Sequence, residues 1–382
     1  MPSFSASILF LFVIALLGVH VQGIPQTAAS GKPINTGSGG SGGGGDSGGG
    51  GDSGGGGGTG SGKPGGTGSG IPSVDDAKNQ LCVPWYGIRD AIMGGLYQGR
   101  CGDNARAAVR LSFHDAGTFS LALQAQALPN GGADGSMLVD PNEVLRAENN
   151  GLQNIVSLLQ PLTAQFNVSA GDILHLAGTL AVLACPGGPV INTYIGRPAP
   201  TNLTPNGLLP NPTDAVEVLL ARFADMGFSS RELAALLGAH SAGKQRFVNP
   251  AQANASFDTT VDIWDTRFYT ETADPTTQPR TFKLESDANL AGNASTSADF
   301  TRFIGKQANW AKEYAAAHEK MSLLGQDVTA LTDCTEIMPA TIDITTLTDA
   351  TSEKTVTDPL IDPTKLEAAI QQFRSIWLVP AA

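Results

Sequence analysis

A glycine-rich run over residues 37–70 limits which part of the chain can form a folded domain. GGGGDS-type units repeat there around Asp46 and Asp52, and much of the glycine, 47 residues in all, lies in this stretch. Such a segment has nothing apolar to bury and loses a large backbone entropy on ordering, so we expect a disordered spacer. No strand precedes it and no helix follows at once, which argues against a phosphate-binding loop. The folded part is therefore expected within residues 71–382.

The amino-terminal residues have the pattern of a secretory signal peptide. Residues 8–17 form an unbroken apolar block, and small residues follow near Gly23. The block is short for a membrane span, which favours a signal peptide over an anchor. We therefore expect a signal peptide at 1–23, a disordered Gly-rich linker at 24–70, and a mature protein that is secreted, extracellular and not held by a membrane.

Net charge and cysteine content narrow the partners and the compartment. A formal net charge of −12 argues against nucleic acid as a partner. Four cysteines behind a signal peptide imply two disulfides, and the sequence alone allows three pairings. Asn-X-Ser/Thr sequons fit the same secretory route and suggest a glycoprotein.

Apolar spacing and helix caps predict a mostly α fold without internal repeats or a convincing series of strands. Ser169 with Asp172, and Ser229 with Glu232, have the spacing of helix capping boxes. Asp103 or Asn104 could cap the helix that carries Arg110 and His114, and Thr213 could cap the helix expected at 214–226. The expected helices span 85–95, 104–116, 151–160, 169–184, 214–226, 231–240 and 297–324.

The remaining stretches are expected to be irregular. Residues 117–137 lack periodicity and contain paired glycines, which predicts a loop. Residues 341–382 are rich in Thr, Asp and Pro, and we expect an extended carboxy-terminal arm there with one short helix at 365–373.

Arg110 and His114 stand four residues apart on the helix expected at 104–116, so they share one face. A fixed guanidinium beside an imidazole suits proton transfer next to developing negative charge. A half-buried histidine with a surface arginine is the commoner meaning of such a pair, so this stretch alone does not define a site.

The segment Ala239–Gly243 allows two functional interpretations. It resembles a nucleophile elbow, which would make Ser241 the nucleophile of an α/β-hydrolase. That motif needs a buried strand before the serine, whereas Glu232–Leu237 consists of helix formers. Alternatively, His240 ends a helix among small residues and can ligate a metal or a haem iron. A satisfied core histidine is the simplest explanation of the segment in isolation.

Taken together, the two histidine segments resemble the plant-type haem peroxidase superfamily, specifically its secreted fungal class II branch. The resemblance covers residues 80–340 and keeps the motifs in order. It implies a haem peroxidase domain at 71–340, with distal and proximal helical halves that sandwich one non-covalent haem b. The matching motifs are Arg110–Asp115, Ser169–Asp172, Cys185–Gly188, Gly196–Pro198, Gly238–Ser241 and Lys320–Asp327.

On the distal side, the resemblance implies a catalytic role for each matching residue. His114 would take a proton from peroxide and return it to the leaving oxygen. Arg110 would stabilise the charge that forms as the O–O bond breaks. Asn149 matches the asparagine that orients the distal imidazole, with Glu143 behind it, and Asn150 is a one-residue alternative.

On the proximal side, the resemblance makes His240 the axial iron ligand. Asp287 matches the carboxylate that accepts a hydrogen bond from that imidazole and raises its basicity. Phe113 and Phe257 replace tryptophans of the intracellular cytochrome c-oxidising branch, and both are expected at the haem.

Two calcium sites and two disulfides are also implied by the resemblance. Calcium prefers oxygen ligands from carboxylates, hydroxyls and backbone carbonyls. Each set begins directly after a histidine, which would let the ion fix the segment that bears it. The distal set is Asp115, Gly132, Asp134 and Ser136, and the proximal set is Ser241, Asp258, Thr260, Ile263 and Asp265. The disulfides would be Cys82–Cys334 and Cys101–Cys185.

The chain departs from the specialised fungal enzymes at two places. The positions of the manganese-binding carboxylates hold Asp103, Ala107 and Arg246, so no Mn²⁺ site is expected. The position of the surface tryptophan of ligninases holds Ala235, so that electron route should also be missing.

The sequence therefore predicts a monomeric secreted peroxidase that reduces H₂O₂ and oxidises small phenolic or similar aromatic donors in one-electron steps. Lignin degradation is one process such an enzyme could serve. Two alternatives remain open at this point: an α/β-hydrolase that uses Ser241, and a non-catalytic cell-wall or adhesion protein built on the same fold.

Overall fold

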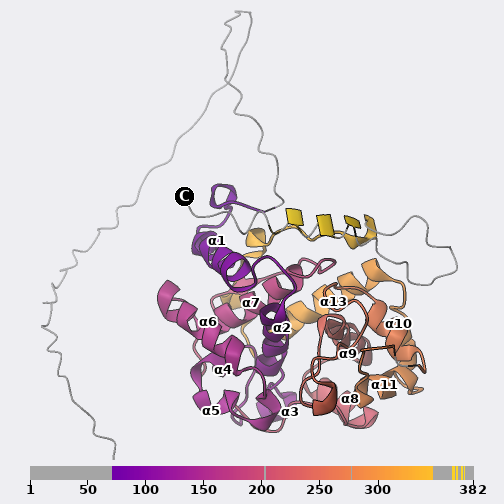
Figure 1. The fold of residues 1–382 in the computed structure, drawn as a ribbon. Coiled ribbons are helices and arrows are strands. Elements are labelled where there is room, and N and C mark those ends of the chain that lie inside the picture. Colours follow the sequence, from indigo (N-terminus) through magenta and orange to yellow (C-terminus); the bar gives the residue numbers. More distant parts are fainter. Residues whose placement is uncertain are drawn as a thin grey trace, which may run out of the picture. The chain divides into compact units, whose positions relative to one another are not determined.

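The computed structural model in Figure 1 describes residues 71–201, 204–276, 278–346 and seven positions between 364 and 374. The predicted signal peptide at 1–23 and linker at 24–70 lie outside the described residues, as does most of the arm predicted at 341–382. Within the short helix predicted at 365–373, those positions that are described are helical.

The described part is mainly α-helical, as predicted from the sequence. The first helices are α1 (Val83–Asp90), α2 (Asp103–Ala116), α3 (Leu121–Ala125), α4 (Ser136–Val139), α5 (Pro141–Val144), α6 (Gln153–Phe166) and α7 (Ala170–Leu183). They are followed by α8 (Val216–Asp225), α9 (Ser230–Leu237), α10 (Arg267–Ala273), α11 (Glu285–Gly292), α12 (Ser297–Thr301) and α13 (Gln307–Ser322). Two strands of two residues each, β1 (Tyr194–Ile195) and β2 (Thr332–Asp333), pair antiparallel with Tyr194 opposite Asp333.

Short turns of tighter or wider helix connect these elements. A π-helical turn, η3 (Ala91–Leu96), continues α1. The 3₁₀ turns are η1 (Val74–Asp76), η2 (Gln80–Cys82), η4 (Ala147–Asn149), η5 (Gly238–Ala242), η6 (Pro250–Gln252), η7 (Val328–Ala330), η8 (Thr335–Ile337) and η9 (Ile344–Thr346).

The buried apolar residues form two hydrophobic cores. The first is formed mainly by helices α1 to α7, and the second mainly by helices α8 to α13. Figure 1 shows α1, α4, α5 and α6 on one side, α8 to α11 on the other, and α2 and α7 between them. Almost every residue of α7 is buried, as expected for a helix that is apolar on all sides. Leu111 of α2 and Leu174 of α7 are fully buried in the first core, and Trp264 and Trp310 in the second.

Two disulfides join distant parts of the chain, in the pairs that the resemblance implies. Cys82 bonds to Cys334, and Cys101 bonds to Cys185 at the end of α7. The first bridge spans 252 residues of sequence. Closing so long a loop in the unfolded chain stabilises the fold by about 5 kcal/mol in the chain-entropy model.

Some predicted helix starts were right and others were wrong. Ser169 accepts a hydrogen bond from the Asp172 amide at the start of α7, and Ser229 forms a full capping box with Glu232 at α9. By contrast, α2 is preceded by Gly102 and has no side-chain cap. The helix predicted from Thr213 begins at Val216, after Ala215.

Two longer predictions also need correction. Residues 117–137 were predicted to be a loop, but they contain α3 and the start of α4, because Ser120 caps α3 by accepting from the Leu123 amide. The helix predicted at 297–324 is divided into α12 and α13, and Gly305 between them has a φ of 62°, in the left-handed region. Glycine adopts this conformation at low cost, which allows the chain to turn between the two helices.

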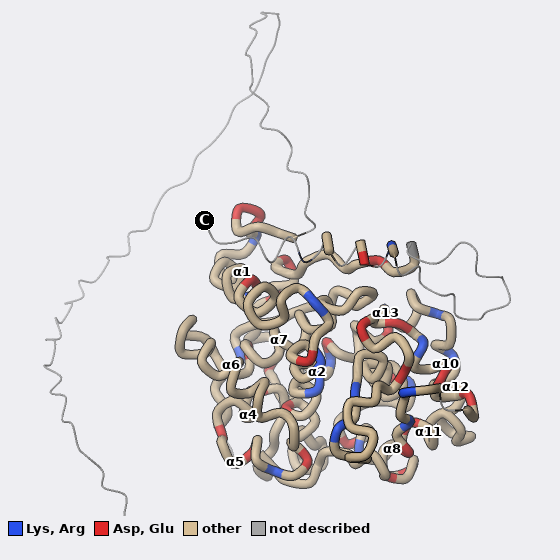
Figure 2. The backbone as a smooth tube through the Cα atoms, in the orientation of Figure 1, with Lys and Arg blue, Asp and Glu red and all other residues tan. Residues whose placement is uncertain are grey.

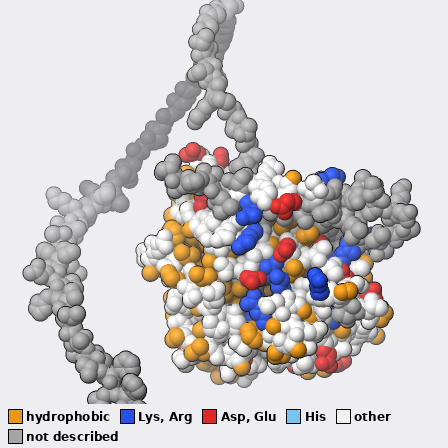
Figure 3. All heavy atoms as spheres, viewed as in Figure 1, with side chains coloured by type: hydrophobic (Ala, Val, Ile, Leu, Met, Phe, Trp, Pro, Cys, Tyr) orange, Lys and Arg blue, Asp and Glu red, His pale blue; other side chains and the backbone are white. Residues whose placement is uncertain are grey.

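Charged residues are spread over the whole described body. Figure 2 shows Lys, Arg, Asp and Glu on most elements, and Figure 3 shows basic and acidic side chains mixed along the middle of the face that is drawn. Ion pairs such as Arg246–Asp103 and Arg302–Glu313 combine opposite charges from separate elements. No helix in the described residues has both the length and the apolar character needed to cross a membrane.

Candidate active site

The first half of the site is formed by α2 and the 3₁₀ turn η4. His114, in the last turn of α2, is buried, and its Nδ1 lies 2.8 Å from Oδ1 of Asn149. The amide nitrogen of Asn149 donates to the backbone carbonyl of Glu143 at 2.8 Å. Because that bond fixes the orientation of the amide, Asn149 Oδ1 accepts a hydrogen bond from the N–H at His114 Nδ1. The imidazole therefore keeps its lone pair on Nε2.

His114 is held in its neutral form. Burial lowers the pKa of its imidazole to about 3, and the positive charge of Arg110 contributes in the same direction. A neutral imidazole with Nε2 unprotonated can act as a base over the whole ordinary pH range. The hydrogen bond to Asn149 raises the pKa of His114 and so opposes these two effects, but it fixes the tautomer without adding negative charge.

Arg110 is positioned by backbone carbonyls of the segment that also carries Asn149. Its guanidinium donates to the carbonyl of Asn150 at 2.9 Å and to that of Glu148 at 3.1 Å. Asn150, the one-residue alternative to Asn149, thus contacts Arg110 through its backbone, and the side chain that meets His114 is that of Asn149.

Glu143 lies behind Asn149 but contacts it only through its backbone carbonyl. Its carboxyl group is buried, and burial raises its pKa to about 7, with the charge of Asp115 adding to the effect. The nearest charged partner is Arg146, at 4.0 Å.

The second half of the site is formed by η5 and α11. His240 Nδ1 lies 2.8 Å from Oδ2 of Asp287, which is buried in the first turn of α11. The His240 side chain is 32% exposed, and no hydrogen bond within the described residues engages its Nε2. The ring lies between Phe257, with centroids 4.9 Å apart, and Phe268, at 5.6 Å.

His240 was predicted to end a helix, and that detail was wrong. The helix α9 ends at Leu237, and His240 lies in the 3₁₀ turn that follows. Close packing of the turn requires Gly238, since an added Cβ would lie 2.5 Å from both Trp310 Nε1 and the Tyr269 hydroxyl. His240 is therefore positioned by a turn that follows α9 and packs closely against Trp310 and Tyr269.

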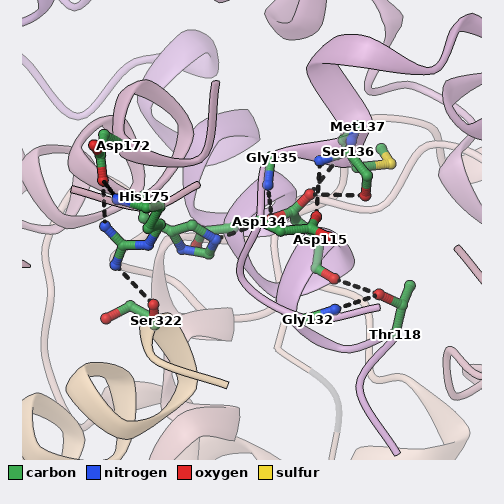
Figure 4. Close-up of polar contacts among 12 residues, drawn as sticks. Asp115, Thr118, Gly132, Asp134, Gly135, Ser136, Met137, Asp172, His175 and Ser322 are labelled. Carbon is green, nitrogen blue, oxygen red and sulfur yellow. Dashed lines mark hydrogen bonds and ion pairs between the residues drawn. The ribbon is translucent and has the colours of Figure 1, made fainter. Parts of the chain in front are cut away.

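The predicted distal calcium residues surround one buried carboxylate (Figure 4). Asp115 follows His114 and accepts hydrogen bonds from the amides of Gly135 at 2.9 Å and Met137 at 3.3 Å. Ser136 approaches it through its hydroxyl, at 3.4 Å, and donates its amide to Asp134 at 3.0 Å. Gly132 lies on the same loop.

Two carboxylates are therefore buried close together in this loop. Burial raises the pKa of Asp115 to about 7, and burial with repulsion from Asp115 raises that of Asp134 to about 7. A bound cation would relieve both effects, and the carboxylate, hydroxyl and carbonyl oxygens present are those that calcium prefers.

His175 was not singled out from the sequence, although it belongs to this region. It lies within α7, and its Nε2 is 3.0 Å from Oδ2 of Asp115 (Figure 4). Its one signal in the sequence is that it is the only histidine in a helix made mainly of apolar residues. Nearby, Arg197 pairs with Asp172 at 2.9 Å, which explains how two motif residues far apart in sequence stabilise each other.

The predicted proximal calcium residues are Ser241, which follows His240 directly, and four residues of the loop at 258–265. Ser241 and Asp258 are fully buried, and neither Ser241 Oγ nor Asp258 Oδ2 has a hydrogen-bond partner within the described residues. Thr260 donates its hydroxyl to Asp265 at 3.1 Å and its amide to Asp258 at 2.9 Å, and Ile263 is on the same loop. Burial and repulsion from Asp265 raise the pKa of Asp258. Buried oxygens without donors fit a calcium ion well.

The side chains around each histidine fit the chemistry of a haem site. His240 offers an imidazole whose other nitrogen is held by a carboxylate, which is the usual arrangement of an iron ligand. Phe113, 5.9 Å from His114, and Phe257, beside His240, add apolar rings on the two sides. Within the described residues, no group of three or more His, Cys, Asp or Glu side chains is placed to hold a metal ion, and each predicted calcium set contains only two carboxylates.

Comparison with known proteins agrees with this arrangement. The peroxidase family model matches residues 90–306, and the model of the fungal peroxidase extension region matches 309–360. Manganese peroxidase 3 of Phlebia radiata is 33% identical over 284 residues, covering 69% of this chain and 78% of the relative. The peroxidase of Arthromyces ramosus is 34% identical over 289 residues, covering 71% and 79%. Ligninase H2 of Phanerodontia chrysosporium is 32% identical over 286 residues, covering 70% and 77%.

The mostly helical fold, the two histidine pairs and the two family matches together define the class as haem peroxidase. The chain belongs to the peroxidase family, among the fungal class II enzymes. The resemblance inferred from the motifs is thereby confirmed, as are the fold class and the oxidoreductase activity.

The two alternative functions are not supported. Ser241 follows a helix and a 3₁₀ turn instead of a strand, and its hydroxyl is completely buried, so it is not placed as a hydrolase nucleophile. A non-catalytic scaffold would not require His114, Asn149, His240 and Asp287 to form their two pairs.

Proposed function

We propose that this protein is a generic secreted peroxidase that reduces H₂O₂ and oxidises small phenolic or similar aromatic donors. The observation that carries the proposal is the matched pair of contacts, His114 with Asn149 and His240 with Asp287, each at 2.8 Å. The first pair leaves His114 neutral, with an unprotonated Nε2 that can act as a base. The second pair leaves Nε2 of His240 electron-rich and available to iron.

His240 would hold the iron of one non-covalent haem b, with Phe113 and Phe257 beside the ring. When bound, the haem would supply the iron that passes electrons from the donors to peroxide. Two calcium ions would occupy the distal set around Asp115 and the proximal set around Asp258, and would fix the segments bearing the two histidines.

His114 moves the proton. Its Nε2 takes a proton from one peroxide oxygen and returns it to the other, which leaves as water. Arg110, held by two carbonyls, stabilises the negative charge that develops on the leaving oxygen. Asn149 keeps Nδ1 protonated during both transfers, and Asp287 increases the basicity of His240. Two phenolic donor molecules then each give up one electron and one proton, so that one peroxide is converted to two waters.

The absence of a manganese site is part of the proposal. Of the three positions considered, Asp103 is the acidic one, and its carboxylate is bonded to Arg246 at 2.9 Å and to Arg106 at 3.2 Å. Two guanidiniums leave little negative charge for Mn²⁺. Ala235 is 1% exposed, so the position of the ligninase surface tryptophan is buried here. We expect a monomeric enzyme that uses neither nucleic acid nor a membrane.

The direct test is the absorption spectrum of the purified haem-loaded protein before and after H₂O₂, followed by a phenol and, separately, Mn²⁺. We expect a spectral change with peroxide that the phenol reverses and Mn²⁺ does not. His240→Ala should lose the haem band. A protein that does not respond to peroxide would refute the function, and rapid Mn²⁺ oxidation would refute the donor class.

A further inference from the structure

A cluster of aromatic side chains fills the core near α9, α10 and α13, which lie in the same half of the molecule (Figure 1). Trp264 and Trp310 stack with centroids 5.8 Å apart and 13° between their planes. Tyr314 packs edge-on against both, 5.0 Å from Trp264 and 5.8 Å from Trp310. All three are buried, and the peroxide chemistry described above uses none of them.

The cluster is connected to His240 by further ring contacts. Phe268 lies edge-on to His240 at 5.6 Å, Tyr269 lies 5.4 Å from Phe268, and Trp310 lies 5.9 Å from Tyr269. Gly238 allows Trp310 and Tyr269 to touch the backbone of the turn that carries His240. Aromatic rings therefore form an unbroken series from the proximal histidine to the far end of the cluster.

At that far end, Tyr314 meets a buried base. Its hydroxyl lies 3.0 Å from Nδ1 of His318, one turn later on α13, and His318 is fully buried. Burial, together with His175, lowers the pKa of His318 to about 3, so the ring is neutral. In the tautomer protonated on Nε2, the lone pair of Nδ1 accepts the hydrogen bond of the Tyr314 hydroxyl. Burial also raises the pKa of the Tyr314 phenol, so it keeps its proton at rest.

The other oxidisable rings of the cluster lack such a base. Trp310 donates its indole N–H to the Ala235 carbonyl at 3.0 Å, and Tyr269 donates its hydroxyl to the Ala234 carbonyl at 2.7 Å. The indole N–H of Trp264 has no partner within the described residues. A carbonyl cannot take the proton that an oxidised ring releases, whereas an imidazole can.

We propose that Tyr314 and His318 form a redox-active pair that stores one oxidising equivalent inside the protein when no donor is present. The inference rests on the proposed role of His240 as the iron ligand. One electron leaves Tyr314 and passes along the ring series to the peroxide-oxidised centre, while the phenolic proton moves to His318 Nδ1. The products are a neutral tyrosyl radical and an imidazolium. When a donor arrives, Tyr314 regains one electron and the proton returns to its oxygen.

The test is electron paramagnetic resonance of the haem-loaded protein, frozen milliseconds after one equivalent of H₂O₂ without donor. We expect a tyrosyl signal that narrows in protein made with ring-deuterated tyrosine, an arm that needs no substitution. Tyr314→Phe and His318→Phe should each lose the signal while retaining the haem absorption band. Tyr97→Phe is the matched control and should keep it, because Tyr97 is equally buried but its hydroxyl donates to the Ala177 carbonyl at 2.7 Å.

Three results would overturn the inference. The tyrosyl signal could persist in Tyr314→Phe, or the signal could narrow only with deuterated tryptophan, which would place the radical on Trp264 or Trp310. It could also be absent from a sample that oxidises phenol normally, which would leave the peroxidase function intact and refute the pair alone. A protein that fails to react with peroxide in any assay would refute the proposed function, and the pair with it.

Discussion

The two halves of this protein each place a histidine Nδ1 2.8 Å from an oxygen, but the oxygens differ in charge. His114 meets the neutral amide of Asn149, and His240 meets the carboxylate of Asp287. An amide orients an imidazole and leaves it weakly basic, whereas a carboxylate draws its proton and makes the other nitrogen electron-rich. The two hydrogen bonds have the same length but different partners, and in the proposed mechanism the partner determines whether the histidine moves protons or holds iron.

The calcium residues beside the two histidines differ as well. Asp115 accepts hydrogen bonds from two amides, and His175 lies 3.0 Å from it. Ser241 and Asp258 each keep a buried oxygen without a donor within the described residues. If both proposed sites bind calcium, we therefore expect the proximal loop to depend more strongly on the ion than the distal loop does.

The largest expected effect comes from removing the distal base. His114→Leu should slow the reaction with H₂O₂ by about 10²–10⁴-fold, the usual contribution of general acid–base catalysis. Stopped-flow absorbance of the haem band measures this rate. The haem band itself should remain, since His240 is untouched, and a variant that reacted at the normal rate would contradict the assignment.

Removing calcium should destabilise the protein mainly through the proximal half. Each ion present at a hundredfold excess over its Kd contributes about 3 kcal/mol, so a chelator should lower the thermal midpoint. Asp258→Asn should reproduce most of this loss and shift the haem spectrum, because Asp258 lies in the loop next to His240. The control is Asp262→Asn, an exposed neighbour paired with Arg106. Equal effects of chelation on both variants and wild type would contradict the comparison.

Neutralising the proximal carboxylate should have a smaller effect. Asp287→Asn removes the charge that polarises His240, and loss of such a partner typically costs about 10–100-fold in activity or metal affinity. Turnover of a phenol measures the loss of activity, and retention of haem during gel filtration measures the loss of affinity. Glu285→Gln, on the exposed side of the same helix, should behave like wild type.

Making the distal partner resemble the proximal one should alter the pH profile. Asn149→Asp places a negative charge beside His114, which favours the imidazolium and raises the imidazole pKa by about 1–3 units. Because protonated His114 cannot accept a proton, the acid limb of the peroxide reaction should move to higher pH, with little change at neutral pH. Asn150→Asp is the control, and an identical shift in that variant would contradict the assignment of Asn149.

Much of this arrangement could be predicted from the sequence because it depends on local signals. The capping box at Ser229 and the i, i+4 spacing of Arg110 and His114 are contained within a few residues. The helix α9 could be predicted, but the 3₁₀ turn that follows it and carries His240 could not, because that turn packs against Trp310 and Tyr269 from distant segments.

Other features were missed because they depend on contacts across the fold. His175 meets Asp115 only after α7 has packed against α2, and a single histidine in an apolar helix does not indicate its partner. The break between α12 and α13 was missed because the helical pattern continues through it, although Gly305 was visible in the sequence.

The bridge between Cys82 and Cys334 has a consequence for how the protein is made. Cys82 leaves the ribosome long before its partner Cys334, and Cys101 and Cys185 emerge in between. Cys82 therefore has to remain unpaired while two other cysteines become available to it. The bridge therefore forms late, and a nascent chain can be trapped by a premature bond between Cys82 and either intervening cysteine. Production in a host whose secretory compartment contains a disulfide isomerase should give far more active enzyme than production in a reducing cytosol.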